Sequence, residues 1–262
     1  MHWEIMGSGH TKYKDSIAPL ANGEGYFCVA FRSKKDIDLI HAPEDIQDIF
    51  INVIHELWHK QEEPYERVAK GTLQLELPND DDVIQALFTI RMLEELHVHG
   101  YDLVTSSILD SHNSLLTWFF RKRGPGVRRP LSGVVAVTTS GSDGMFIVRD
   151  NQEVNRVIRE VITDAWPFGV ISEKNFDYDQ TQETVQYYRL TGYPWAGNRM
   201  ILELVRHLMA KMGEINWKFL AKSNFNNSSD VLFFVQDSEP SPALHDLGGF
   251  ADILIIPFQI II

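Results

Sequence analysis

Residues 36–59 read DIDLIHAPEDIQDIFINVIHELWH, and this stretch decides the fold because residues 144–167, GMFIVRDNQEVNRVIREVITDAWP, repeat its pattern. Each stretch reads as a short apolar strand, a polar turn and an amphipathic helix that ends near a tryptophan, Trp58 or Trp166. Two stretches with the same order of apolar and polar residues predict that one structural unit occurs twice.

The repeat extends well beyond these two helices. From Gly25 and Gly133 to the ends of the helices, the two copies align without a gap at an offset of 108 residues (166 − 58). From Pro78 and Pro194 onward they align again, at an offset of 116 residues (194 − 78). We place the eight extra residues (116 − 108) in the polar stretch at 175–184 of the second copy, where an insertion costs little free energy.

The apolar pattern within each copy predicts strands and helices in the same order. In the first copy we expect helices that begin near residues 43 and 82 and strands near 26–31, 37–40, 73–77, 101–109 and 115–120. In the last of these strands, Leu116 aligns with Leu232 at the offset of 116. We therefore predict an α+β fold of two tandem homologous domains, each a mainly antiparallel sheet with two helices, packed as a pseudo-symmetric pair.

Composition and the repeat together predict the domain boundaries. We expect an N-terminal arm at 1–24, repeat domain 1 at 25–121, a basic linker at 122–131, repeat domain 2 at 132–236, and a C-terminal segment at 237–262 that ends in a buried strand. The basic run RKRGPGVRR at 121–129 contains Gly and Pro, which interrupt regular structure, so we interpret it as solvated chain. An anion-binding or nuclear-localisation segment is the alternative.

Charge and cysteine content exclude several classes of function. The 262-residue chain has a net charge of −12, which opposes binding to nucleic acid. A single cysteine, Cys28, cannot form an intramolecular disulfide, which favours a reducing, cytoplasmic location. The most apolar stretch, Ile253–Ile262, has about half the length of a membrane span and is interrupted by Pro257. We expect neither nucleic acid nor membrane as a partner.

One recognisable catalytic motif occurs, HELWH at residues 55–59, which fits the H-E-x-x-H pattern of zinc-dependent hydrolases. His55 and His59 are four residues apart and share a helix face, and Glu56 would polarise a metal-bound water. A third ligand would have to come from the next predicted helix, which contains Glu94, Glu95, His97 and His99.

The second copy weakens the metal interpretation. There TDAWP at residues 163–167 occupies the place of HELWH, so the same helix is built without metal ligands. Pro167 in place of His59 also indicates that the helix ends at the tryptophan, a poor position for a rigid ligand. We therefore expect no catalytic residue, metal or cofactor, and a zinc-dependent hydrolase using His55, Glu56 and His59 is the alternative function.

Nucleophilic catalysis has little support in the sequence. Cys28 lies within an apolar strand, where a thiol is inert core. The run SGSDG at 140–144 has Ser where a G-x-S-x-G nucleophile elbow begins with Gly, and the repeat places a strand after it. We interpret this run as a turn between two strands.

The best binding candidates lie in the second copy. Tyr193 and Trp195 flank a proline just before a helix, with Arg199 nearby, and Tyr178 lies in the longer loop of this copy. Exposed aromatic residues and arginine are typical of protein interfaces. The alternatives are that Trp195 packs inward to fix the helix entry, and that the loop only shields an edge strand.

These residues predict a non-enzymatic protein-binding or assembly protein. We expect its ligand to be a protein partner or a second copy of the chain. The expected binding surface is the face of the second copy or the cleft between the two copies.

The second copy also contains a set of spaced motifs. They are Trp166-x-x-Gly169, Leu190-x-Gly192-x-Pro194-Trp195, Trp217, and Asp230-x-Leu-x-Phe234. The chain resembles a family of uncharacterised eukaryotic proteins that share W-x-x-G, L-x-G-x-P-W, G-W and D-x-L-x-F motifs, here as a tandem duplication. Asn216 stands where the G-W motif has Gly, and the first copy matches only at 38–43 and Trp58. The resemblance implies a shared fold and supplies no catalytic residue.

Overall fold

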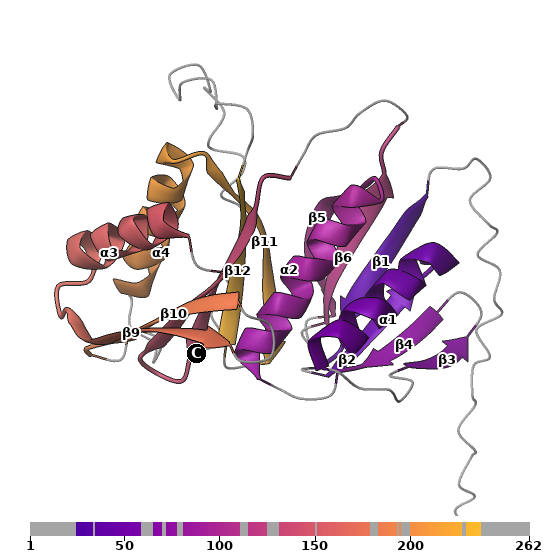
Figure 1. The fold of residues 1–262 in the computed structure, drawn as a ribbon, viewed down its shortest axis with the longest axis horizontal. Helices are drawn as coiled ribbons and strands as arrows, with labels where there is room; N and C mark the ends of the chain where they lie inside the picture. The colour runs from indigo at the N-terminus through magenta and orange to yellow at the C-terminus, as the bar shows by residue number, and fades with distance from the viewer. Residues whose placement is uncertain are drawn as a thin grey trace, which may run out of the picture.

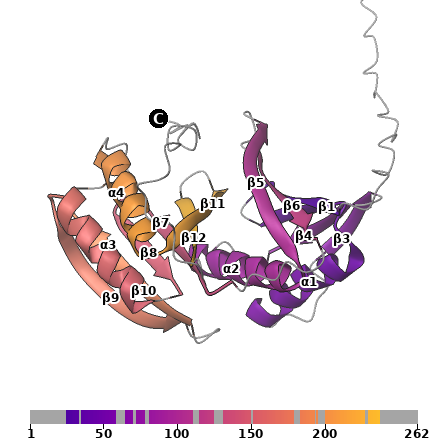
Figure 2. The ribbon, with the colours of Figure 1, turned by 90° about the horizontal axis from the view of Figure 1, so that it is seen from above.

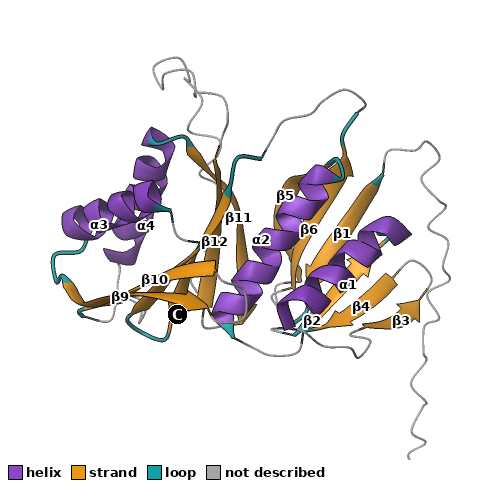
Figure 3. Cartoon of the chain, in the orientation of Figure 1, coloured by secondary structure: helices purple, strands orange, loops and turns teal. Residues whose placement is uncertain are grey.

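The computed structural model describes residues 25–236 except 34, 59–64, 70–71, 78–80, 111–114, 125–130, 150, 179–182, 193, 195–199 and 227–228. These residues form two domains, each an antiparallel six-stranded sheet with two helices (Figure 1). The predicted α+β fold of two tandem homologous domains is confirmed, and Figure 3 shows its division into helices and strands. The predicted arm at 1–24 and C-terminal segment at 237–262 lie outside the described residues.

The two domains have the same order of elements. Domain 1 contains β1 (Tyr26–Phe31), β2 (Asp36–Ile40), α1 (Glu44–Trp58), β3 (Tyr65–Ala69), β4 (Thr72–Glu76), α2 (Asp82–Val98), β5 (Tyr101–Asp110) and β6 (Leu115–Lys122). Domain 2 contains β7 (Val134–Ser140), β8 (Gly144–Val148), α3 (Gln152–Ala165), β9 (Val170–Tyr178), β10 (Glu183–Leu190), α4 (Met200–Glu214), β11 (Trp217–Asn226) and β12 (Ser229–Gln236). The strand orders are β3-β4-β2-β1-β6-β5 and β11-β12-β7-β8-β10-β9, which are the same topology read in opposite directions. Strand β3 falls in a stretch that the sequence left without a predicted strand.

The backbone repeats as well as the side-chain pattern. His41 and Arg149 both follow the second strand of their domain, 108 residues apart (149 − 41), and both have positive φ, 57° and 70°. Gly100 and Asn216, 116 residues apart (216 − 100), both precede a strand with φ of 84° and 60°. Positive φ is uncommon outside glycine, so its recurrence at matched positions confirms the duplication independently of the sequence pattern.

The strand register corrects where the eight extra residues lie. Leu39 pairs with Leu73 in domain 1, and its counterpart Ile147 pairs with Gln186 in domain 2. The offset at these strands is therefore 113 residues (186 − 73). Five extra residues (113 − 108) precede β10 and three (116 − 113) lie between β10 and α4, so the prediction of one insertion near 175–184 was wrong. Two aligned stretches without gaps show only that extra residues lie somewhere between them, and not at which point.

A second correction concerns the alignment of the last hairpin of each domain, β5–β6 and β11–β12. Ala30 pairs with Thr117, whereas its counterpart Thr138 pairs with Val231, which gives an offset of 114 residues (231 − 117). Leu232 therefore matches Trp118, not Leu116, because the β11–β12 hairpin is two residues shorter. A shift of two leaves every side chain on the same face of the sheet, so the apolar pattern cannot detect it.

The sheet of domain 2 is covered on both faces. Val135 and Val137 pack with α3 and α4 of the same domain, whereas Val134 and Ala136 belong to the core of domain 1. Helix α2 of domain 1 contacts β7, β8 and β12, and Figure 2 shows it between the two sheets. A sheet buried on both faces requires continuous apolar strands, which explains why five consecutive residues of β7 are buried.

The two domains do not use equivalent surfaces in this contact. Leu87 and Ile90 of α2 are buried, and the equivalent residues of α4 (offset 116) are Glu203 and Arg206, which are exposed and form an ion pair of 2.9 Å. The prediction of a pseudo-symmetric pair is therefore wrong. A helix face with these charges would lose their hydration against a second sheet, so only α2 is covered on both sides.

Ion pairs also join the domains. Arg91 of α2 lies 2.9 Å from Glu183 of β10. Arg149, which follows β8, pairs with Glu94 of α2 and lies 3.4 Å from Glu183. These side chains are all partly buried, so the network contributes more to a fixed domain orientation than exposed pairs would.

The predicted solvated linker at 122–131 differs from the structure at both of its ends. Strand β6 extends through Lys122, and the Arg123 side chain is only 11% exposed because it pairs with Asp102. Leu131 packs against the core of domain 1. Residues 125–130, the middle of this segment, lie outside the described residues.

Candidate functional site

The predicted binding residues fall almost entirely outside what the structure describes. Tyr193, Trp195 and Arg199 lie outside the described residues, and Tyr178 is described only as the last backbone position of β9. Pro194, between two of them, is buried. The residues just before this segment, Thr191 and Gly192, are described and belong to a corner of domain 2.

This corner joins the α3–β9 connection to the end of β10. Trp166, 1% exposed, donates a hydrogen bond from its indole Nε1 to the carbonyl of Thr191 at 2.8 Å. The Thr191 N–H in turn donates to the carbonyl of Gly169 at 3.0 Å. The sequence motifs around Trp166 and Gly192 are therefore adjacent in space and hold each other in place.

Phe168 lies on top of this corner. Its ring makes an edge-to-face contact with Trp166, with ring centroids 5.2 Å apart. Gly192, at φ 83°, lies against the ring, and a Cβ at that position would meet it at 3.4 Å. A glycine is required at 192 chiefly by its positive φ, and the same glycine lets the backbone approach the phenylalanine closely.

Three large apolar side chains are exposed beside this corner, and we call them the apolar patch: Phe168 (52% exposed), Val170 (42%) and Ile171 (54%). Val170 and Ile171 begin β9, the edge strand of its sheet. The patch was not predictable from the sequence, because an apolar pair at the start of a strand has the same pattern whether it faces the core or solvent. Their position on an edge strand was the missing information.

Residues 172–175 of β9 are polar. Glu173 bonds Arg159 of α3 and accepts from the Gln186 side chain at 3.1 Å, while Lys174 is exposed. Tyr188, which pairs with Glu173 on the neighbouring strand, is 1% exposed, and burial followed by the Glu173 charge raises the pKa of its phenol to about 12. The middle of this edge strand is thus charged.

The two tryptophans at the helix ends differ in burial. Trp166 is fully buried, but Trp58 is only partly buried and packs against Phe88 of α2, with ring centroids 6.0 Å apart. Both positions are structural. The G-W position is structural too, because Asn216 adopts the positive φ that glycine adopts at position 100.

The H-E-x-x-H motif is only partly described. Helix α1 ends at Trp58, Glu56 is exposed, and His59 lies outside the described residues. Among the residues that the structure describes, no group of three His, Cys, Asp or Glu side chains could hold a metal ion. The zinc-hydrolase alternative stays a prediction, and metal analysis of wild type and His55→Ala would test it.

The two nucleophile candidates have structural roles. Burial raises the pKa of the half-buried Cys28 thiol, which opposes formation of the reactive thiolate. Residues 140–144 form the predicted turn between β7 and β8, where Asp143 pairs with Arg189 at 2.8 Å.

A model of one uncharacterised domain family matches the chain twice, at residues 25–121 and 133–238. The chain therefore belongs to this family and carries its domain in tandem. No curated protein and no solved structure matches the chain. Within the described part of the chain, no helix is both long enough and apolar enough to cross a membrane.

Proposed function

We propose that this chain is a non-enzymatic protein-binding or assembly protein whose binding surface is the apolar patch of domain 2. The observation that carries this proposal is the exposure of Phe168, Val170 and Ile171, at 42–54% of their surface, within four consecutive residues of the chain. Apolar side chains gathered at a surface are typical of interaction sites, whereas single exposed ones are ordinary. The fixed corner beneath Phe168 limits the conformational entropy that binding would cost.

The predicted binding residues extend this surface in the proposal. Tyr193, Trp195 and Arg199 follow Gly192 directly in the chain, and Tyr178 ends the strand that Val170 begins. Aromatic side chains and an arginine around an apolar centre match the composition of interface hot spots.

The charges on β9 favour a partner that contacts the patch over one that adds a strand to the whole edge. If two copies of β9 paired antiparallel about Lys174, the two lysines would face each other. A register centred on Glu173 would oppose two carboxylates. Charged residues in the middle of an edge strand protect it from pairing of this kind.

The remaining parts of the proposal concern partner charge and location. A net charge of −12 supports a neutral or basic protein surface as the partner and disfavours nucleic acid. A single cysteine supports a reducing, cytoplasmic environment.

Ile171→Lys tests the proposal, with Val98→Lys as the matched control. Both residues are exposed, Ile171 at 54% and Val98 at 76%, but Val98 lies at the end of α2 in domain 1. Self-association is measured by sedimentation velocity. Partners captured from cells of the source organism are purified and titrated against wild type and both variants. We expect Ile171→Lys to weaken association at least about tenfold and Val98→Lys to leave it unchanged. Equal affinities of wild type and Ile171→Lys would refute the proposal.

A further inference from the structure

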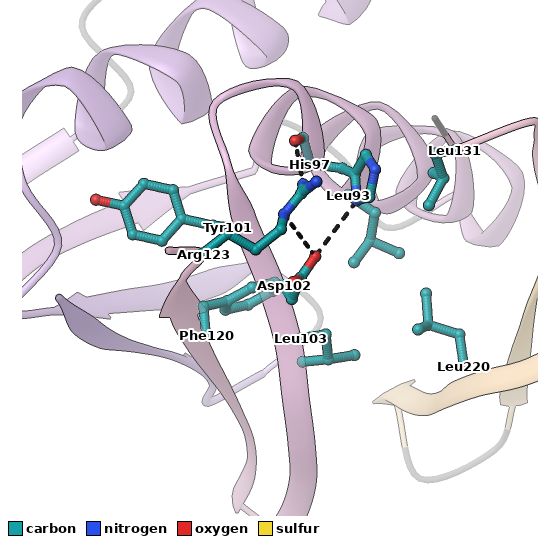
Figure 4. A pocket seen from close by; sticks show the side chains of 9 residues that line it. All are labelled: Leu93, His97, Tyr101, Asp102, Leu103, Phe120, Arg123, Leu131 and Leu220. Atoms are coloured by element: carbon teal, nitrogen blue, oxygen red, sulfur yellow. Dashed lines mark hydrogen bonds and ion pairs between the residues drawn. The ribbon is translucent and has the colours of Figure 1, made fainter. Parts of the chain in front are cut away.

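A cavity of about 350 Å³ lies at the junction of the two domains. This volume is at the lower end of the range of small-molecule sites, roughly 300–1,000 Å³. The described residues that line the cavity come from α2, β5, β6 and the chain after β6 in domain 1, and from β11 and the chain before β7 in domain 2. They are Leu93, His97, Tyr101, Asp102, Leu103, Phe120, Arg123, Leu131 and Leu220 (Figure 4).

Most of the lining is apolar. Leu103, Leu131 and Leu220 pack against the core of domain 1 but are only partly buried. Leu220 belongs to domain 2, so the cavity depends on the packing of one domain against the other. An apolar molecule in this cavity would remove three leucine side chains from water.

The polar part of the lining is an ordered cluster. Asp102 Oδ1 forms an ion pair with Arg123, 3.1 Å from its Nε, and lies 3.5 Å from His97 Nδ1. The Arg123 guanidinium also donates to the His97 carbonyl, and the Arg123 N–H donates to the Gly100 carbonyl at 2.6 Å. These bonds fix Arg123, which is 11% exposed, and Arg123 in turn fixes the carboxylate.

Asp102 retains an acceptor atom for a ligand. Its side chain is 43% exposed, and both of its ion pairs within the described part of the chain use Oδ1. Oδ2 can therefore accept a further hydrogen bond. Since an ionised carboxylate only accepts, the complementary ligand group is a donor such as an amine or a hydroxyl.

We propose that this cavity binds a small molecule with an apolar body and a hydrogen-bond-donating head, an amine above all. The apolar body contacts Leu103, Leu131 and Leu220, and the head donates to Asp102 Oδ2. A carboxylate head finds no donor in Asp102 and meets its negative charge. The net charge of −12 also favours cations at the protein surface. This site is separate from the apolar patch and does not depend on the proposed function.

Three probes with one aromatic body test the chemical class: naphthalen-1-ylmethylamine, naphthalen-1-ylmethanol and naphthalene-1-acetate. Each is titrated into the full chain by calorimetry or by protein-observed NMR. We expect the amine to bind at least about tenfold more tightly than the acetate, with the alcohol between them, because a hydrogen bond to an ionised group is the strong kind. No saturable binding of the amine, or acetate binding as tight as amine binding, would overturn the proposal.

Three variants locate the binding. Asp102→Asn is expected to reduce the preference for amine over acetate to less than about threefold, because the amide removes the charge. Leu220→Trp fills the cavity and is expected to weaken the binding of all three probes at least about tenfold. Val104→Trp is the control, since Val104 is 50% exposed and does not line the cavity. Unchanged amine binding in folded Leu220→Trp would show that the site is wrong.

Discussion

The contribution of the contact between the domains to stability can be measured by comparing one position in the two repeats. Phe233 pairs with Ala136, and Phe119 pairs with Cys28, the counterpart of Ala136 (136 − 28 = 108). The two phenylalanines therefore occupy the same place on the outer face of their sheets. Phe233 is fully buried by domain 1, whereas Phe119 is half-buried on the face that α2 does not cover.

Truncation to alanine should consequently cost very different amounts. Phe233→Ala removes a fully buried ring that contacts Trp118 edge-to-face at 5.6 Å, and we expect a loss of about 3–5 kcal/mol in the free energy of unfolding. Phe119→Ala removes a ring that already meets solvent, and we expect a loss of about 1–2 kcal/mol. The difference, about 2–3 kcal/mol, is attributable to cover by the neighbouring domain.

Urea unfolding followed by tryptophan fluorescence and circular dichroism measures both losses. If the domains unfold in separate steps, the Phe233 loss is read from the step that involves domain 2. Losses that agree within about 0.5 kcal/mol would refute the reasoning, since they would mean that α2 and Trp118 do not cover this face in solution.

Three further predictions concern a buried phenol, two positions with positive φ, and an ion pair between the domains. Tyr188 has a folded pKa of about 12 against an ordinary 10.0, so stability should fall as pH rises from 10 towards 12, and urea titrations on either side of pH 10 should show this loss in wild type but not in Tyr188→Phe. Gly100→Ala should cost about 1–2 kcal/mol through its positive φ alone, whereas Asn216→Gly should cost less than about 0.5 kcal/mol, both by thermal melting. A double-mutant cycle of Arg149→Met and Glu94→Gln should give a coupling energy of about 0.5–2 kcal/mol, and a coupling near zero would contradict a role in joining the domains.

The repeat and the element order were predictable because apolar periodicity reports which face of an element is buried. The predicted helix start near residue 82 agrees with the structure, where Asp81 accepts from the backbone N–H of Val83 and Ile84 at 2.8 and 3.1 Å. Strand β3 was missed because Tyr65–Ala69 has no apolar alternation. The two-residue difference between the last hairpins was missed because it preserves alternation.

The candidate sites were less accessible to sequence reasoning. Val170 and Ile171 are exposed at the start of an edge strand, and the cavity is lined by Leu220 of one domain and Leu103 of the other. Both facts depend on tertiary packing. The buried face of domain 2 did leave a signal in the sequence, since the outer face has Val231 where domain 1 has Thr117. The comparison needs the offset of 114 residues, which only the strand register supplies.

The contact between the domains joins a helix to the back of a sheet, so the two surfaces in contact are unlike each other. Identical single domains that associated in this way would add end to end, into a closed ring or into a fibre of unlimited length. In this chain the face of α4 that is equivalent to the contact face of α2 has Glu203 and Arg206, which are exposed and paired with each other. This is how terminal repeats end a stacked array. The charged face of α4 thus opposes a repeat of the contact that α2 makes with the neighbouring sheet.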